Sequence, residues 1–251
     1  MITIDDFFKP AMASNISEDN YSILPAYINA VDILAKTTYQ SVYLIDYNKK
    51  EFLYVSKNPL FLCGLAPQQV TQMGYSFYFE KVPEKDLEML LEINAAGFEF
   101  FQKTPVDERL DYLISYDFHL AHPDNKQILI NHKLTPLLLD NNHNIWISLC
   151  VVSVSTKAKA GNVELRNIKD GTVYTYSFEK GEWGENKQIE LTPREREIVL
   201  LSARGFTINE IAEKIFLSPD TIKFHRKNLF HKIGVQTIAE VILYATNYNL
   251  I

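Results

Sequence analysis

Cysteine is scarce in this sequence, and long apolar segments are missing. Its 251 residues include two cysteines, Cys63 and Cys150, which stand far apart and have no His or Cys neighbour at metal-binding spacing. We expect both to be small buried apolar side chains. No apolar run approaches the roughly 20 residues that a membrane span needs. The first eight residues contain Asp5 and Asp6, whereas a secretory signal has basic residues in this position. The sequence therefore predicts a cytoplasmic protein with no membrane contact.

Motifs of catalysis and cofactor binding are missing as well. Residues 1–155 contain no glycine-rich phosphate loop, no Walker motif and no Ser/His/Asp or Cys/His constellation. Cys63 stands in NPLFLCG, which does not match the cysteine motif of flavin photoreceptors. Four histidines are candidate haem ligands by residue type alone, and three of them lie at or near predicted turns, where a surface histidine is expected: His119, His122, His132 and His143. No cofactor is predicted.

Charge is unevenly distributed along the chain. The overall net charge is −6, but from Thr192 onward eight basic and six acidic side chains leave +2, against −8 for residues 1–191. Binding of a duplex depends on where the positive charges lie rather than on the total. The acidic part is therefore a poor nucleic-acid binder, and only the last sixty or so residues are compatible with that function.

Four short helices are predicted in this last part, at residues 193–203, 208–215, 219–232 and 238–247. Thr192, Thr207 and Thr237 each precede a glutamate by three residues, which is the spacing of a capping box. At the start of the third helix, Ser218 precedes a proline and can act as the N-cap. Gly205 and Gly234 follow the first and third helices, where a left-handed residue is expected. The second and third helices are separated by three residues, which predicts a helix-turn-helix corner.

The third helix has two different faces. Ile222, Leu229 and Ile233 lie on one side, which leaves mainly polar and charged residues with one exposed aromatic ring on the other: Lys223, Phe224, Lys227, Asn228 and His231. Lysines can reach guanine O6/N7 or phosphate in the major groove, and Phe224 can pack on a thymine methyl. Arg226 and Lys232 flank this face and can hold the DNA backbone. The alternative is an ordinary solvated face, but a bare phenylalanine there indicates contact with something.

The stretch from Leu191 to Ala245 resembles the LuxR/NarL-type DNA-binding domain. The matching segments are LTPRERE, the glycine before the second helix, EIAEKI, S-x-x-T-I-K-x-H and NLFHKIGV. The resemblance implies a four-helix domain that places its third helix in the major groove of double-stranded DNA and often dimerises through its fourth. It also implies that Lys223, Phe224 and Lys227 read bases. For four further residues the resemblance implies contact with the DNA backbone or a supporting role: Thr221, His225, Asn228 and Lys232.

The preceding part has the pattern of an α+β domain. Residues 18–37 are helix-like, with Tyr27, Val31 and Leu34 at helical spacing. Strands are predicted at 41–47 and 51–56, an amphipathic helix at 84–102, and three antiparallel strands at about 112–121, 127–139 and 145–155. This order resembles a PAS sensor domain. Its aromatic residues can line a small apolar pocket, although such residues more often fill a core: Phe52, Tyr54, Phe61, Phe77, Tyr78, Phe79, Phe98 and Phe101.

The predicted organisation has four parts: a helical segment at 1–37, a PAS-like domain at 38–155, a connector at 156–190 and the DNA-binding domain at 191–251. The connector contains a predicted hairpin around Asp170-Gly171. It can act as a spacer, extend the preceding sheet or cover the DNA-binding domain.

The favoured function is that of a dimeric transcriptional regulator. Its PAS-like domain either senses a signal, for example a small apolar ligand, or mediates dimerisation. One alternative makes the PAS-like domain a protein-interaction module without a ligand. The other, disfavoured for lack of a catalytic constellation, makes residues 1–155 an enzyme that the tail targets to DNA.

Overall fold

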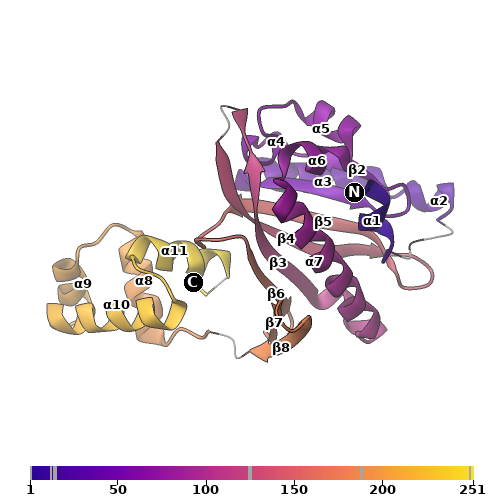
Figure 1. Ribbon diagram of the computed structural model, residues 1–251. Coiled ribbons are helices and arrows are strands. Elements are labelled where there is room, and N and C mark those ends of the chain that lie inside the picture. Colours follow the sequence, from indigo (N-terminus) through magenta and orange to yellow (C-terminus); the bar gives the residue numbers. More distant parts are fainter. Residues whose placement is uncertain (1, 12, 14–15, 124–125, 187–188, 249) are drawn as a thin grey trace. The chain divides into compact units, whose positions relative to one another are not determined.

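The computed structural model describes the chain except residues 1, 12, 14–15, 124–125, 187–188 and 249. It divides into two compact units, Met1–Asn186 and Lys187–Ile251 (Figure 1). None of the helices in the described part of the chain is long and apolar enough to cross a membrane.

The first unit is built on one antiparallel sheet with the strand order β2-β1-β5-β4-β3-β6-β7-β8. The strands are β1 (Ser41–Asp46), β2 (Glu51–Val55), β3 (Tyr112–Ala121), β4 (Gln127–Leu139), β5 (Ile145–Val154), β6 (Gly161–Asn167), β7 (Val173–Ser177) and β8 (Glu182–Asn186). Because β1 and β2 are followed by helices and then by β3, β4 and β5, the order of elements is the one expected of the PAS-like fold. The predicted α+β class is confirmed.

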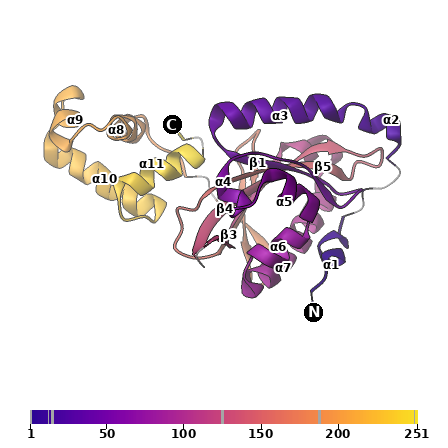
Figure 2. The same cartoon turned by 90° about the horizontal axis from the view of Figure 1, so that it is seen from above.

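Helices cover both faces of this sheet (Figure 2). One face is packed by α1 (Ile4–Phe8), α4 (Pro59–Leu62), α5 (Pro67–Met73), α6 (Ser76–Lys81) and α7 (Glu84–Lys103). The opposite face of β1 and β5 is packed by α3 (Leu24–Thr38), through Leu24, Val31 and Ala35. A 3₁₀ helix, Val106–Asp111, leads from α7 into β3.

The N-terminal helical segment differs from its prediction. Instead of one helix over 18–37, the chain forms α2 (Glu18–Tyr21) and then α3, with Ser22 and Ile23 between them. Pro25 stands in the first turn of α3, where a missing N–H costs nothing, and it disfavours the helical continuation that would join the two. The predicted stripe also changes, because Val31 is buried while Leu34 is 47% exposed.

The segment after β5 is part of the sheet. β6 pairs with β3, from Tyr112 opposite Asn167 to Asp117 opposite Gly161, and β7 pairs with β6. The hairpin predicted around Gly171 therefore forms, and a third strand, β8, which was not predicted, follows it and pairs with β7. Of the roles left open by the sequence, the structure shows an extension of the sheet.

The second unit consists of α8 (Pro193–Ala203), α9 (Ile208–Lys214), α10 (Pro219–Ile233) and α11 (Ile238–Asn247). These bounds agree with the predicted helices to within one residue. All three predicted capping boxes form, and Ser218 caps α10 by accepting a hydrogen bond from the backbone N–H of Thr221. Gly205 and Gly234 both have the positive φ expected at helix ends.

One buried carboxylate links α8 to α10. Glu195 Oε2 accepts hydrogen bonds from the backbone N–H of Thr192, at 2.9 Å, and from Lys232 Nζ, at 2.8 Å. Burial by itself would raise the pKa of Glu195, but the bonds from Lys232 and Thr192 outweigh burial and hold the pKa below its ordinary value. The ionised side chain therefore stabilises both the start of α8 and its packing on α10.

We predict that Glu195→Gln lowers the unfolding free energy of the second unit by about 1–3 kcal/mol, because Lys232 loses its charged partner. The contribution of Glu195 is present above the ordinary carboxyl pKa and is lost as the pH falls through the lowered value. The variant should therefore lose less stability on acidification than the natural protein. Urea unfolding followed by helical circular dichroism measures both effects. Glu197→Gln, in an exposed pair with Arg194, is the matched control, and equal losses in the two variants would contradict the prediction.

Candidate nucleic-acid interface and apolar cavity

Helix α10 is held in the second unit by one side only. Ile222 and Leu229 are fully buried and Ile233 nearly so. Ile222 packs with Ile198, Ile211 and Ile215 of α8 and α9, whereas Leu229 and Ile233 pack with α11. Because these three residues recur along a single face, the opposite face of α10 stays in solvent.

That opposite face carries the three residues expected to read bases. Lys223, Phe224 and Lys227 are all exposed, and the Phe224 side chain is 61% exposed. Lys223 and Lys227 are one helical turn apart, so the two cations are neighbours on the surface, and Phe224 lies beside them. Over its length α10 has four basic side chains and one acidic side chain. This surface combines positive charge with an exposed aromatic ring.

The one acidic residue of α10 does not neutralise this face. Asp220 accepts a hydrogen bond from Lys223 Nζ at 3.0 Å, but the two side chains are 88% and 62% exposed. An exposed pair of this kind contributes at most about 1 kcal/mol. Lys223 can therefore exchange Asp220 for a phosphate or a base edge at little cost.

The expected supporting residues occupy different surroundings. Thr221, His225 and Arg226 are half-buried along α10, and Asn228 is exposed. Thr221 takes part in the cap at the start of the helix, where its Oγ1 lies 2.8 Å from Ser218 Oγ. Lys232, near the other end of α10, is bonded to Glu195 rather than free. The structure thus brings Lys223, Phe224, Lys227 and Asn228 together on the open face and places Lys232 in the packing against α8.

Phe216 is an exposed turn residue for which the sequence predicted no role. It lies between α9 and α10, its side chain is 93% exposed, and its φ is 55°. A left-handed backbone at a residue other than Gly, Asn or Asp is uncommon and is a reason to look for function. The sequence feature that could have indicated this residue is a bulky aromatic side chain in the three-residue connection between two helices.

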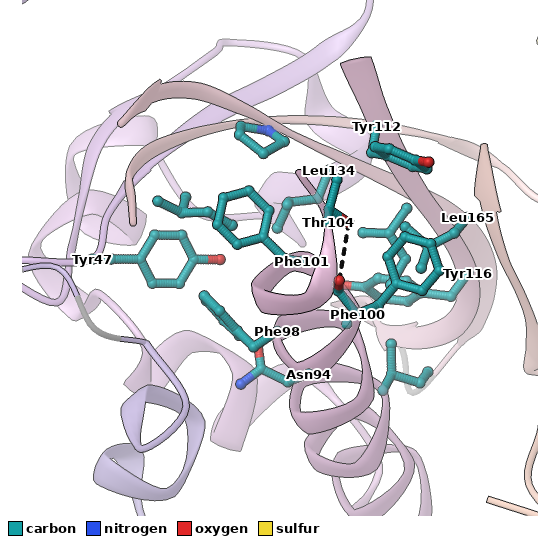
Figure 3. A pocket seen from close by; sticks show the side chains of 15 residues that line it. Tyr47, Asn94, Phe98, Phe100, Phe101, Thr104, Tyr112, Tyr116, Leu134 and Leu165 are labelled. Atoms are coloured by element: carbon teal, nitrogen blue, oxygen red, sulfur yellow. Dashed lines mark hydrogen bonds between the residues drawn. The ribbon is translucent and has the colours of Figure 1, made fainter. Parts of the chain in front are cut away.

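A cavity of about 60 Å³ lies in the first unit between α7 and the sheet (Figure 3). Aromatic and aliphatic side chains from distant parts of the chain line it: Tyr47, Phe98, Phe100, Phe101, Tyr112, Tyr116, Leu134 and Leu165. Of the aromatic residues singled out in the sequence, Phe98 and Phe101 line this cavity. Phe52, Phe61, Phe77 and Tyr78 are buried in the core, as expected for the more common role of such residues.

Two polar side chains at the cavity, Asn94 and Thr104, have hydrogen-bond partners within the chain. Asn94 Nδ2 donates to the carbonyl oxygen of Phe7 at 2.5 Å, and Thr104 Oγ1 donates to that of Phe100 at 3.0 Å. The space is also small, since an apolar cavity that holds benzene has a volume of about 150 Å³. As the side chains stand, the cavity can accept only a molecule smaller than an aromatic ring.

A polar group lies deep in the core on the same side of the sheet. Tyr43 shares one hydrogen bond with the hydroxyl of Tyr78 and another, 2.5 Å long, with His132 Nε2. The ring of Tyr43 stacks on Phe61 with centroids 4.2 Å apart. His132 is 1% exposed, and its Nδ1 has no hydrogen-bond partner within the described part of the chain. Burial lowers the pKa of His132 from 6.5 to about 3, so this imidazole is neutral near neutral pH.

The four histidines considered as haem ligands are in separate places. His119 bonds to Asp86 through Nδ1 at 2.8 Å, and His122 lies 3.1 Å from the carbonyl oxygen of Leu60. His143 lies in the β4–β5 turn and His132 is buried beside Tyr43. Among the described residues, no group of three or more His, Cys, Asp or Glu side chains could hold a metal ion. Cys63 and Cys150 are free and buried, as predicted.

Residues 190–245 match the family model described as bacterial regulatory proteins, luxR family. The transcriptional regulatory protein MctR of Rhizobium johnstonii is 41% identical over 71 residues, which are 28% of this chain and 33% of that protein. The response regulator protein VraR of Staphylococcus aureus is 41% identical over 61 residues, 24% of this chain and 29% of that protein. The chain thus spans about a third of the length of the curated relatives that it matches.

Solved structures similar to the chain have low sequence identity. A phage VqmA–DPO complex is 18% identical with a TM-score of 0.31, covering 90% of this chain and 89% of that one. The Vibrio cholerae VqmA dimer without target DNA is 16% identical with a TM-score of 0.30, covering 94% and 89%. The PAS-B domain of Drosophila melanogaster Cycle is 17% identical with a TM-score of 0.34, covering 46% and 99%.

We predict that His132 makes the first unit sensitive to mild acid. The pKa of His132 in the folded state is below its value in the unfolded state. The contribution of the neutral side chain to the unfolding free energy is therefore intact above pH 6.5 and is lost as the pH falls towards 3. Between about pH 7.5 and about pH 5 the natural protein should lose about 2 kcal/mol more unfolding free energy than His132→Gln, which cannot titrate. Urea titrations read by tryptophan fluorescence measure the difference. His143→Asn, at an exposed turn, should keep the natural pH dependence, and the same slope in His132→Gln would contradict the prediction.

Proposed function

We propose that this chain, whose second unit contains a LuxR-family helix-turn-helix domain, is a transcriptional regulator that binds specific sequences of double-stranded DNA. The observation that supports this most directly is the open face of α10. It presents Lys223, Phe224 and Lys227 to solvent within the residues that match the family model. An α-helix with such a face fits the major groove, where each base pair offers a distinct set of donors and acceptors.

In this proposal the residues of α10 have different tasks. Lys223 and Lys227 donate to guanine O6/N7 or to phosphate, and Phe224 packs on a thymine methyl group. Arg226 and Asn228 contact the sugar-phosphate backbone, with Thr221 and His225 holding the register of the helix. Lys232 supports the orientation of α10 through its bond to Glu195. Phe216, at the exposed turn, extends the same surface toward the backbone.

We further propose that two copies act together and that the first unit controls their arrangement. A regulator of this kind works when one arrangement of its DNA-binding units is favoured over another. Two inputs are compatible with a PAS-like unit: a small apolar ligand and contact with a protein. The small volume of the cavity and the internal hydrogen bonds of Asn94 and Thr104 favour protein contact as the input.

The arrangement of the potentially catalytic side chains in the first unit argues against catalysis as the main activity. The His, Cys and carboxylate side chains of the first unit are dispersed, and the buried ones are engaged with neighbours in the core. We therefore infer a regulator rather than an enzyme, acting in the cytoplasm, where bacterial DNA is located.

We predict that Lys223→Ala and Lys227→Ala each weaken binding to the selected duplex by about 1–3 kcal/mol if the side chain reads a base. A lysine that contacts only phosphate should instead weaken all sequences alike and lower the salt slope by about one. Fluorescence anisotropy at several salt concentrations distinguishes the two. Arg196→Ala, an exposed cation on α8, is the control and should change the affinity little.

The duplex for this measurement comes from selection by the full chain in a random pool. The expected product is a site with two-fold symmetry, because paired helix-turn-helix units bind symmetric half-sites. Unchanged affinity in both lysine variants would refute the assigned reading face. If the full chain enriched no sequence at all, the proposed function would be wrong.

A further inference from the structure

Helix α3 has an apolar face that no other described element of the first unit covers. Its inner side packs on the sheet through Leu24, Val31 and Ala35. A second, outward row follows the same helix beside the first, and its residues are Ile23, Ala26, Tyr27, Ala30, Ile33, Leu34 and Thr37. We call these seven residues the outer stripe. At about 100° of rotation for each residue they fall within about 120° of the helix circumference.

The outer stripe is uncharged, and all of its residues except the half-buried Tyr27 are exposed. Ile23 is 44% exposed, Ile33 53% and Leu34 47%, and both alanines are exposed as well. The two charged residues of α3, Asp32 and Lys36, lie outside the stripe and pair with each other. A contiguous apolar surface of this kind on a folded protein marks an interaction site.

The order of residues along the outer stripe suits a second copy of the same helix. In an antiparallel pair related by a two-fold axis at Ala30, Ala26 of one helix faces Leu34 of the other. Tyr27 then faces Ile33, and Ile23 faces Thr37. Ala26 thus meets the larger Leu34 on both sides of the axis, while Tyr27 and Ile33 form a pair of two large side chains. Ala30 meets its own copy, which lets the two backbones approach closely. A two-fold interface needs this self-complementarity, since the same surface supplies both partners.

The charges at the two ends of α3 fit the same antiparallel arrangement. Exposed Glu18 and Asp19 lie in α2, just before the start of α3. Lys36 lies at its other end, next to the exposed Lys57, which acts electrostatically on Asp32. Antiparallel pairing brings the acidic end of one copy near the basic end of the other, whereas parallel pairing would bring like charges together.

We propose that the outer stripe of α3 is a homodimer interface, in which two copies pair antiparallel about an axis that passes between their Ala30 residues. The proposal rests on the proposed function only in requiring that two copies act together. It identifies the first unit as the element that holds the two DNA-binding units as a pair. Because α3 packs on β1 and β5, this interface is connected to these two strands of the sheet through α3 alone.

Disulfide trapping in the full chain tests this geometry without DNA. A residue on a two-fold axis meets its own copy, so Ala30→Cys should form a covalent dimer under mild oxidation, within the Cα–Cα separation of about 4.4–6.8 Å that a disulfide needs. Ile23→Cys and Thr37→Cys should not cross-link alone but should do so when the two variants are mixed. The natural cysteines are buried and should not react. Asn29→Cys, one residue from the axis position but outside the stripe, is the matched control.

A second measurement does not depend on oxidation. Ala30→Glu places two like charges against each other at the axis, so the full chain should change from dimer to monomer in sedimentation at micromolar concentration. Asn29→Glu should remain dimeric. Retention of the dimer by Ala30→Glu, a monomeric natural chain, or cross-linking at Asn29 rather than Ala30 would overturn the proposal. Successful trapping together with no DNA binding would instead refute the proposed function and leave the interface standing.

Discussion

Strand β1 lies between β2 and β5 and is buried along all six of its residues, and the whole first unit is arranged around it. Because side chains alternate along a strand, Tyr43 and Ile45 enter the core beneath the helices from α4 to α7, and Val42 and Leu44 enter the layer under α3. A strand buried on both faces cannot shift its register by one residue without exchanging these two sets. The position of α3 and the packing of the aromatic core are therefore set by the same six residues.

This arrangement gives the first unit a filled interior and an open exterior. Tyr43, Phe61 and His132 fill the space beneath β1 with stacked and hydrogen-bonded rings, and the cavity that remains beside α7 is small. Such a core is stable but has little room for a ligand. The apolar surface that stays exposed to solvent is instead the outer stripe of α3, which lies on the other side of β1. This packing therefore favours protein contact over ligand binding.

The second unit follows a simpler logic. Its helices start at side-chain caps, and positive-φ glycines follow α8 and α10. Glu195 serves both as part of a cap and as the partner of Lys232 across the unit. With one side of α10 used for packing, the opposite side is free to present Lys223, Phe224 and Lys227. The core of the second unit buries Ile222, Leu229 and Ile233, and this determines which face of α10 remains for the proposed base contacts.

Much of this could be inferred from the sequence alone, because the signals concerned are local. Capping pairs such as Thr192 with Glu195 act within one helical turn, so all four helices of the second unit and the exposed face of α10 were predicted, as were the strands that flank α7. Tertiary structure decided what depends on distant partners. The pairing of β6 with β3, the lining of the cavity by Tyr47 and Tyr116, and the exposure of Leu34 beside buried Val31 all require knowing which surface lies opposite. Periodicity identifies an apolar residue on a helix, but only the packing of the whole chain determines whether another element covers it.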